Sequence, residues 1–142
     1  KTEMNMKIIR DFGEYFKYSL HDAHINRIEH KQDNLALYFN YIFSYNEKTE
    51  QTHKAKIIFE HTDIDDIRVL VFNKRWLDDF QGECIDLETY QKKYKNYEFE
   101  VIDESYNWGK AVYQGWLWVQ ETPVYCIMNI YFKGEMIYVI DE

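Results

Sequence analysis

Proline and glycine are scarce in this 142-residue sequence, which contains one proline and five glycines. Collagen-like and low-complexity chains need far more of both residues, so these classes are excluded. Intrinsic disorder is excluded as well, because aromatic residues form 18% of the chain and disordered segments are poor in them. A domain of this length buries about two-thirds of the surface that its unfolded chain exposes, so it can fold without a metal or a disulfide.

Long apolar runs and a recognisable signal peptide are also absent. No stretch approaches the ~18–20 apolar residues of a membrane-spanning helix, so no membrane partner is expected. The sequence starts at Lys1, and two explanations stay open: Met4 or Met6 is the native start behind a tag remnant, or a leader has been removed.

Cysteine occurs only as Cys84 and Cys126, which is too few for a disulfide scaffold. Cys126 lies within an alternating strand pattern and is expected to be a small core residue. A single bridge between the two thiols stays open. Together, these features favour the reducing cytoplasm.

Basic residues are fewer than acidic residues. Lysine and arginine number 17 against 25 aspartates and glutamates, which gives a net charge of −8. A nucleic-acid partner is not expected, because such proteins need a basic face to displace counterions from phosphates. An acidic surface suits a basic protein partner, although it also serves solubility alone.

Motifs of nucleophilic and phosphate chemistry are missing too. The sequence has no Gly-x-Ser-x-Gly elbow, no Gly-Lys-Ser/Thr loop and no cysteine in a catalytic context. We therefore expect neither an enzyme nor a bound cofactor.

What the sequence does contain is a change of hydrophobic period. Ile8, Phe12 and Phe16 recur every four residues and predict a short helix, which Gly13 weakens. Alternation then predicts strands at 23–30, 35–43, 52–60 and 64–72. In the second of these strands one face is predicted to carry Leu35, Leu37, Phe39, Tyr41 and Phe43.

The second half predicts one helix and four more strands. Asp86 can cap a helix over 87–95, with Lys92, Lys93 and Lys95 at its end, where they complement the helix dipole. Strands are expected at 97–104, 111–120, 124–132 and 135–140. The short connections favour antiparallel neighbours.

These elements predict the fold class. We expect a mainly β (α+β) protein: an antiparallel curved sheet, sandwich or partly open barrel of about eight strands with one or two short helices. Residues 1–142 are expected to form a single domain. Open sheet edges make a homo-oligomer plausible.

The segment Ser19-Leu20-His21-Asp22-Ala23-His24 is the most unusual short stretch. Imidazole and carboxylate are zinc and iron ligands, so His21, Asp22 and His24 are a candidate metal site. The alternative is a hydrogen-bonded corner where the chain enters the first hairpin.

The same segment carries a resemblance. Leu20-His21-Asp22-Ala23-His24-Ile25, Ile28 and the run from Asn34 to Phe39 resemble the start of small uncharacterised bacterial proteins of immunity-protein type, over about residues 18–39. The resemblance implies a β-rich, cytoplasmic and non-catalytic protein. It assigns a role to no residue.

Two groups of acidic residues are further candidate sites. Asp63-Ile64-Asp65-Asp66 suggests a calcium loop, but the required glycine and closing glutamate are missing, so a solvated turn is favoured. Glu98 and Glu100 share a strand face and could act as general acid and base. Same-face neighbours reach that spacing through strand geometry alone, so paired surface acids are the default.

The aromatic residues exceed what one core face needs. Trp116 and Trp118 share a strand face, whereas Tyr113 lies on the other. The candidate binding residues are Trp116, Trp118, Tyr113, Tyr125 and Tyr131, because tyrosine and tryptophan combine large contact area with a polar tip. A helix or second sheet that covers them is the alternative.

Three functions from different classes remain. The first is a non-catalytic protein-interaction module, immunity-like in type, that presents an acidic and aromatic surface to a basic protein. The second is a small-ligand or carbohydrate-binding domain with Trp116 or Trp118 in a cleft. The third is a metal-dependent enzyme that uses His21, Asp22 and His24. The first accounts best for the charge and the missing motifs.

Overall fold

The structure is a computed structural model that describes residues 5–72 and 81–141. Strands dominate these residues, in the order β1 (Asn5–Ile9), β2 (Tyr18–Ser19), β3 (His24–Lys31), β4 (Asn34–Tyr45), β5 (Glu50–Phe59), η1 (Ile64–Asp66), β6 (Arg68–Phe72), β7 (Gly82–Asp86), α1 (Leu87–Tyr94), β8 (Glu98–Asn107), β9 (Lys110–Val119), β10 (Thr122–Tyr131) and β11 (Met136–Asp141).

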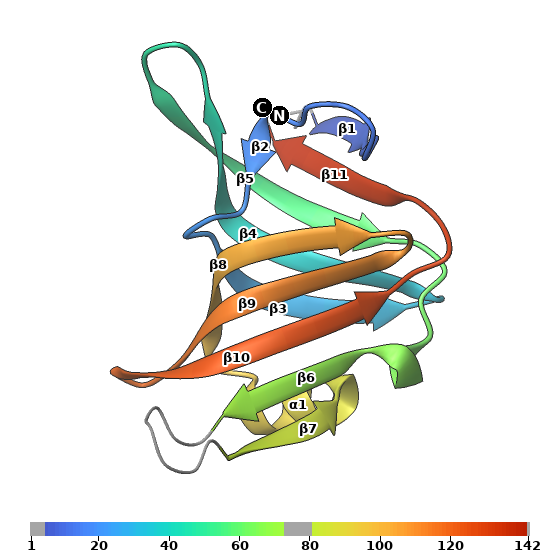
Figure 1. Ribbon diagram of the computed structural model, residues 1–142, viewed down its shortest axis with the longest axis vertical. Helices are drawn as coiled ribbons and strands as arrows, with labels where there is room; N and C mark the ends of the chain where they lie inside the picture. Colours follow the sequence, from blue (N-terminus) through green and yellow to red (C-terminus); the bar gives the residue numbers. More distant parts are fainter. Residues whose placement is uncertain (1–4, 73–80, 142) are drawn as a thin grey trace.

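All the strand pairs are antiparallel and join one continuous sheet. Its order is β1-β11-β5-β4-β3-β8-β9-β10-β6-β7, and β2 pairs with β4 outside this path. The sheet turns between β3 and β8, where only His24↔Glu100 and Ile25↔Phe99 are paired. Five strands thus face five others across the interior (Figure 1). The protein is mainly β, with the curved antiparallel sheet of a sandwich or open barrel, as the sequence predicts.

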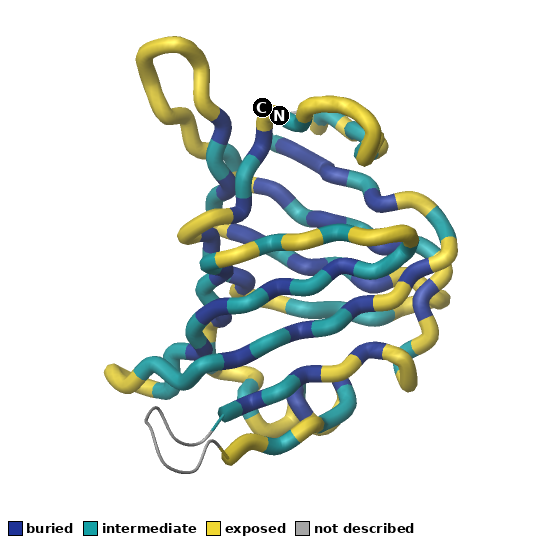
Figure 2. Tube along the Cα trace, in the orientation of Figure 1, coloured by how far each residue is buried: buried dark blue, intermediate teal, exposed yellow. Residues whose placement is uncertain are grey.

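The core lies between the two layers. Residues alternate between buried and partly exposed along the strands, which is the period of a sheet with one covered face (Figure 2). Phe59 of β5 meets Tyr113 of β9 across the interior, with ring centroids 6.5 Å apart. Cys126 is buried in the same core, Cys84 is exposed, and both thiols are free.

Helix α1 confirms the predicted helix and its cap. The Asp86 side chain accepts a hydrogen bond from the Thr89 backbone N–H at 2.8 Å. Leu87 and Tyr90 are buried, and the Gln91 side-chain amide donates to the Ile28 carbonyl of β3 at 2.9 Å. The helix therefore reaches from the β6–β7 edge to the opposite layer.

The predicted helix around Ile8, Phe12 and Phe16 is wrong. Residues 5–9 form strand β1, which pairs with β11 from Asn5↔Asp141 to Ile9↔Ile137. Met6 and Ile8 are partly buried and their neighbours are exposed, so a period of two prevails over the period of four. Strands β2 and β7 were not predicted. The strand predicted over 64–72 begins only at Arg68, because Ile64–Asp66 form the 3-10 turn η1, which the Asp63 side chain caps.

Two β-bulges change which side chains face the core. In β4 the register shifts between Phe39 and Ile42, so Ile42 is buried, whereas Tyr41 and Phe43 lie on the other face, contrary to the strict alternation expected. In β8 it shifts between Val101 and Asp103. An extra residue reverses the pleat, so the end of β8 directs Glu104 and Tyr106 towards the interior.

Within residues 5–72 and 81–141, no helix is long and apolar enough to cross a membrane.

Candidate functional sites

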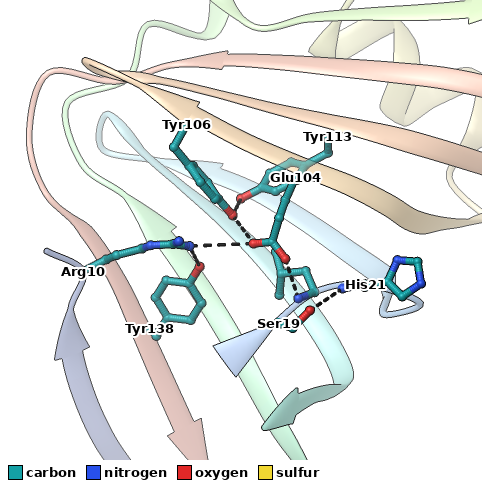
Figure 3. A network of polar contacts seen from close by, with 8 residues as sticks. Arg10, Ser19, His21, Glu104, Tyr106, Tyr113 and Tyr138 are labelled. Carbon is teal, nitrogen blue, oxygen red and sulfur yellow. Dashed lines mark hydrogen bonds and ion pairs between the residues drawn. The ribbon is translucent and has the colours of Figure 1, made fainter. Parts of the chain in front are cut away.

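A polar cluster lies between the layers near one end of the sandwich. It consists of Arg10, Glu104, Tyr106, Tyr113 and Tyr138 and is called the Arg10–Glu104 cluster (Figure 3). The Arg10 guanidinium lies 3.7 Å from the Glu104 carboxylate and donates to the Tyr138 hydroxyl at 2.8 Å. The Tyr106 hydroxyl donates to Glu104 at 2.7 Å and contacts the Tyr113 hydroxyl at 3.1 Å.

The chain brings this cluster together from both layers. Arg10 follows β1, and its backbone N–H bonds to the Met136 carbonyl at 2.9 Å, which fixes it beside β11. The side chain of Glu104 points into the cluster because the bulge in β8 reverses the direction of the residues that follow it. Gly115 of β9 makes room for that bulge, since a Cβ there would lie 1.8 Å from the Glu100 carbonyl oxygen.

Aromatic rings surround the partly buried charge of Arg10. Its guanidinium lies 4.2 Å from the Tyr106 ring centroid and 4.5 Å from that of Phe16. Burial lowers the pKa of Arg10, but Tyr138, Tyr106 and Glu104 outweigh this and raise the pKa overall. Arg10 Nε is buried without a hydrogen-bond partner among the described residues, and the π faces partly compensate it.

The tyrosines of the cluster hold their protons strongly. Burial raises the pKa of Tyr138 to about 12 and raises the pKa values of Tyr106 and Tyr113 well above the usual 10. Neutral hydroxyls that stay protonated over the physiological range act as hydrogen-bond donors and not as bases. The cluster is therefore suited to joining the two layers.

Glu104 also fixes the segment that carries the histidines. Its Oε2 accepts a hydrogen bond from the Leu20 backbone N–H at 2.7 Å. The His21 backbone N–H donates to Ser19 Oγ at 3.1 Å, and His21 Nδ1 lies 2.7 Å from the Ile102 carbonyl oxygen. Figure 3 shows the His21 ring directed away from the cluster. The hydrogen-bonded corner that the sequence offers as the alternative to a metal site is therefore present.

The three predicted metal ligands do not converge. His21 and Asp22 are exposed, with His21 Nε2 3.5 Å from the Asp22 carboxylate. His24 instead faces the outer side of β8, where its Nδ1 lies 2.9 Å from Glu98. In the part of the chain that the structure describes, no three His, Cys, Asp or Glu side chains are placed to hold a metal ion.

The predicted aromatic residues divide between two faces. Trp116, Trp118 and Tyr125 lie partly exposed on the outer face of β9 and β10. Tyr131 is 46% exposed on the same face of β10, but about 20 Å along the strand from Tyr125. The prediction of Tyr113 as a binding residue is wrong. Its side chain is completely buried on the inner face, because its position in β9 has the opposite parity to Trp116.

Acidic side chains lie directly beside the two tryptophans. Glu98 pairs with Trp118 and Glu100 with Trp116 across β8 and β9. The Trp118 indole N–H donates to Glu100 at 3.0 Å, and the Trp116 and Tyr125 rings meet edge to face at 5.9 Å. These five residues form the aromatic–acidic face: Glu98, Glu100, Trp116, Trp118 and Tyr125.

Two surface grooves lie at the end of the sandwich that holds the Arg10–Glu104 cluster. One has a volume of about 880 Å³ and includes Arg10, Phe12, Tyr106 and Trp108 in its wall. The other has about 770 Å³ and includes His30, His61 and Tyr131. Neither groove is lined by Trp116 or Trp118, so the cleft that the carbohydrate-binding alternative needs is not found at these two grooves.

Sequence reasoning missed the Arg10–Glu104 cluster and the larger groove. The predicted short helix contains Arg10, and the strand predicted over 97–104 gives no sign that Glu104 faces the interior. One feature of the sequence could have pointed to the larger groove, which is the tryptophan at position 108. Bulky residues are unusual beside a glycine in a two-residue hairpin turn.

Comparison of this chain with protein families, with curated proteins and with solved structures finds no match.

Proposed function

We propose that this protein is a non-catalytic protein-interaction module that binds a basic segment of a partner through the aromatic–acidic face. The observation that carries the proposal is the adjacency of Glu98 and Glu100 to Trp116 and Trp118 on one sheet face. A lysine or arginine side chain can contact a carboxylate and an indole ring there at the same time.

Two further features support a basic partner. The net charge of −8 attracts cations from a distance and accelerates association with them. Glu98 is 48% exposed and so is free to meet a new cation, although His24 already contacts it. Tryptophan, tyrosine and arginine are the residues that dominate interface binding energies.

The resemblance to immunity-type proteins extends this proposal. It makes the basic partner a toxin, and the chain a neutralising protein of the cytoplasm. A toxin-like reading frame directly upstream of the coding sequence is the genetic observation expected on this basis. Such a product should bind the wild-type chain and lose affinity when Trp116 is changed to alanine.

A peptide titration tests the face itself. A labelled nonapeptide of alternating arginine and serine is titrated by fluorescence anisotropy, with an alternating glutamate–serine peptide as the comparison. We expect the arginine peptide to bind measurably tighter. Trp116→Ala should weaken it about tenfold, which corresponds to about 1.4 kcal/mol. Glu98→Gln should weaken it less and reduce its dependence on salt.

The matched controls lie elsewhere on the surface. Glu88→Gln removes an exposed acid of α1 that pairs with Lys92, and Tyr15→Ala removes a ring that is 87% exposed. Both variants should bind the arginine peptide as the wild-type chain does. Equal affinity for the two peptides, or equal losses in the controls and in Trp116→Ala, would contradict the proposal.

A further inference from the structure

The turn between β8 and β9 contains an unusual residue for its conformation. Asn107 pairs with Lys110, so Trp108 and Gly109 form a two-residue hairpin turn with φ of 40° and 80°. Both values are left-handed, and such turns favour Asn-Gly because a large side chain is strained there. Gly109 suits its position, whereas Trp108 does not.

Packing within the described residues does not compensate for this strain. The Trp108 side chain is fully exposed. The turn itself is held firmly by backbone contacts, because the Phe132 N–H donates to the Gly109 carbonyl at 2.9 Å. A strained, exposed indole on a rigid turn destabilises the folded chain, and residues strained in this way cluster at ligand-binding sites.

The surroundings of Trp108 define the chemistry of a ligand. Trp108 lines the groove of about 880 Å³ together with Phe12, which is 50% exposed, and Tyr106. We call this the end groove. It lies where the β8–β9 turn meets the β10–β11 connection, on the right in Figure 1. Its volume falls in the range of about 300–1,000 Å³ that is usual for small-molecule sites.

Three basic side chains line the end groove, although the protein as a whole is acidic. Arg10, Lys110 and Lys133 line it, against the acids Asp11 and Glu135. The Asp11 carboxylate is already engaged by the Gly13 backbone N–H at 2.9 Å. The charge of Arg10 is already met by Glu104, whereas Lys110 and Lys133 form no ion pair among the described residues. These two lysines can therefore attract an anion to this place.

We propose that the end groove binds a small organic anion that carries an aromatic ring. The ring stacks on Trp108 and Phe12, and the anionic group lies near Lys110 and Lys133. This site is separate from the aromatic–acidic face, so it does not depend on the function proposed above.

A fluorescent probe tests the site. The probe is 8-anilinonaphthalene-1-sulfonate, and N-phenyl-1-naphthylamine serves as its neutral counterpart. We expect saturable binding of one sulfonate probe, at least fivefold tighter than that of the neutral amine. Trp108→Asn should weaken sulfonate binding at least tenfold, and Lys133→Gln about threefold. The controls Tyr15→Ala and Lys92→Gln remove an exposed ring and an exposed cation elsewhere and should change nothing.

Thermal unfolding of the same variants separates binding from folding. Trp108→Asn places the preferred residue in the turn, so its unfolding midpoint should equal or exceed that of the wild-type chain. Loss of binding with undiminished stability supports the proposal. A lower midpoint, unchanged sulfonate binding in Trp108→Asn, or equally tight binding of the neutral amine would overturn it.

Discussion

Glu104 is a largely buried carboxylate that is held by three neighbours. Its side chain is only 20% exposed, and its oxygens meet Arg10, the Tyr106 hydroxyl and the Leu20 backbone N–H. A buried ion pair adds little net stability over an apolar pair, but loss of one partner leaves an uncompensated charge. The cluster therefore selects one arrangement of the layers and penalises any change that breaks it.

Substitution of Glu104 by glutamine tests this reading. Glu104→Gln keeps the shape but leaves the Arg10 cation without its carboxylate, so we expect the free energy of unfolding to fall by about 3 kcal/mol. Urea denaturation measures the loss. Glu88→Gln, which breaks an exposed pair with Lys92, should cost at most about 0.5 kcal/mol.

A double variant then distinguishes charge pairing from packing. Arg10→Met removes the stranded cation, so the double variant should be more stable than the sum of the two single losses predicts. Strictly additive losses would show that Arg10 and Glu104 are not coupled.

His21 is the second residue with a testable charge. Its hydrogen bond to the Ile102 carbonyl raises its pKa above 6.5, with a smaller contribution from Asp22. A pKa that is higher in the folded chain than in the unfolded chain stabilises the fold below the unfolded value, and that gain disappears as the pH rises through the folded value.

The contribution of His21 to stability should therefore decrease as the pH rises. His21→Ala should destabilise the fold more at about pH 5.5 than at about pH 8.5, because the protonated ring gains more from the carbonyl and Asp22 than the neutral ring does. Titration of the His21 ring protons by NMR should give a midpoint above 6.5. A midpoint below that value, or a loss that grows with pH, would contradict the hydrogen bond.

Among the elements, β8 shows most clearly what the sequence could and could not reveal. Its existence and the outward direction of Glu98 and Glu100 follow from alternation, as do the buried positions of Cys126 and of β5. Its antiparallel pairing with β9 follows from the short connection between them. The inward turn of Glu104 does not, because a single extra residue reverses the pleat without any mark in the hydrophobic pattern. Tyr41 was misplaced for the same reason.

The wrong helix has a different cause. Residues 5–9 carry too short an apolar pattern to separate a period of four from one of two, and pairing with β11 decides the outcome. That partner lies at the other end of the chain, so local periodicity could not show it. The aromatic–acidic face could be foreseen, because each of its side chains lies in a regular stretch of strand.

Gly115 is the residue of β9 that makes the β8 bulge possible. A Cβ on Gly115 would overlap the Glu100 carbonyl oxygen at 1.8 Å, and backbone cannot move aside as a flexible side chain does. We therefore expect Gly115→Ala to destabilise the fold by about 3 kcal/mol or more, measured by urea denaturation. Gly13→Ala is the control, because its Cβ would only approach a flexible Asp11 oxygen at 3.3 Å, and it should stay within about 0.5 kcal/mol. Equal losses in the two variants would refute this role of Gly115.

At the scale of the whole molecule, the sheet has two ends of unequal support. Strands β9 and β10 pair on both sides, whereas β1 and β7 end the strand order of the described residues. Helix α1 packs beside β7, with Lys93 and Glu83 paired at 2.7 Å. At the other end, Arg10 ties the chain after β1 to Tyr138 and Glu104, which joins one sheet end to the opposite layer.

Native-state hydrogen exchange should follow this arrangement. Backbone amides of β9 should exchange only with global unfolding, and those of β1 through smaller openings that cost at least about 2 kcal/mol less. Arg10→Met should lower the protection of β1 relative to that of β7, because β7 keeps its helix while β1 loses its tie. Comparison of the two ends within one sample cancels any general loss of stability. If β1 and β7 lose protection equally, Arg10 stabilises the molecule as a whole, and the sheet end at β1 has no anchor of its own.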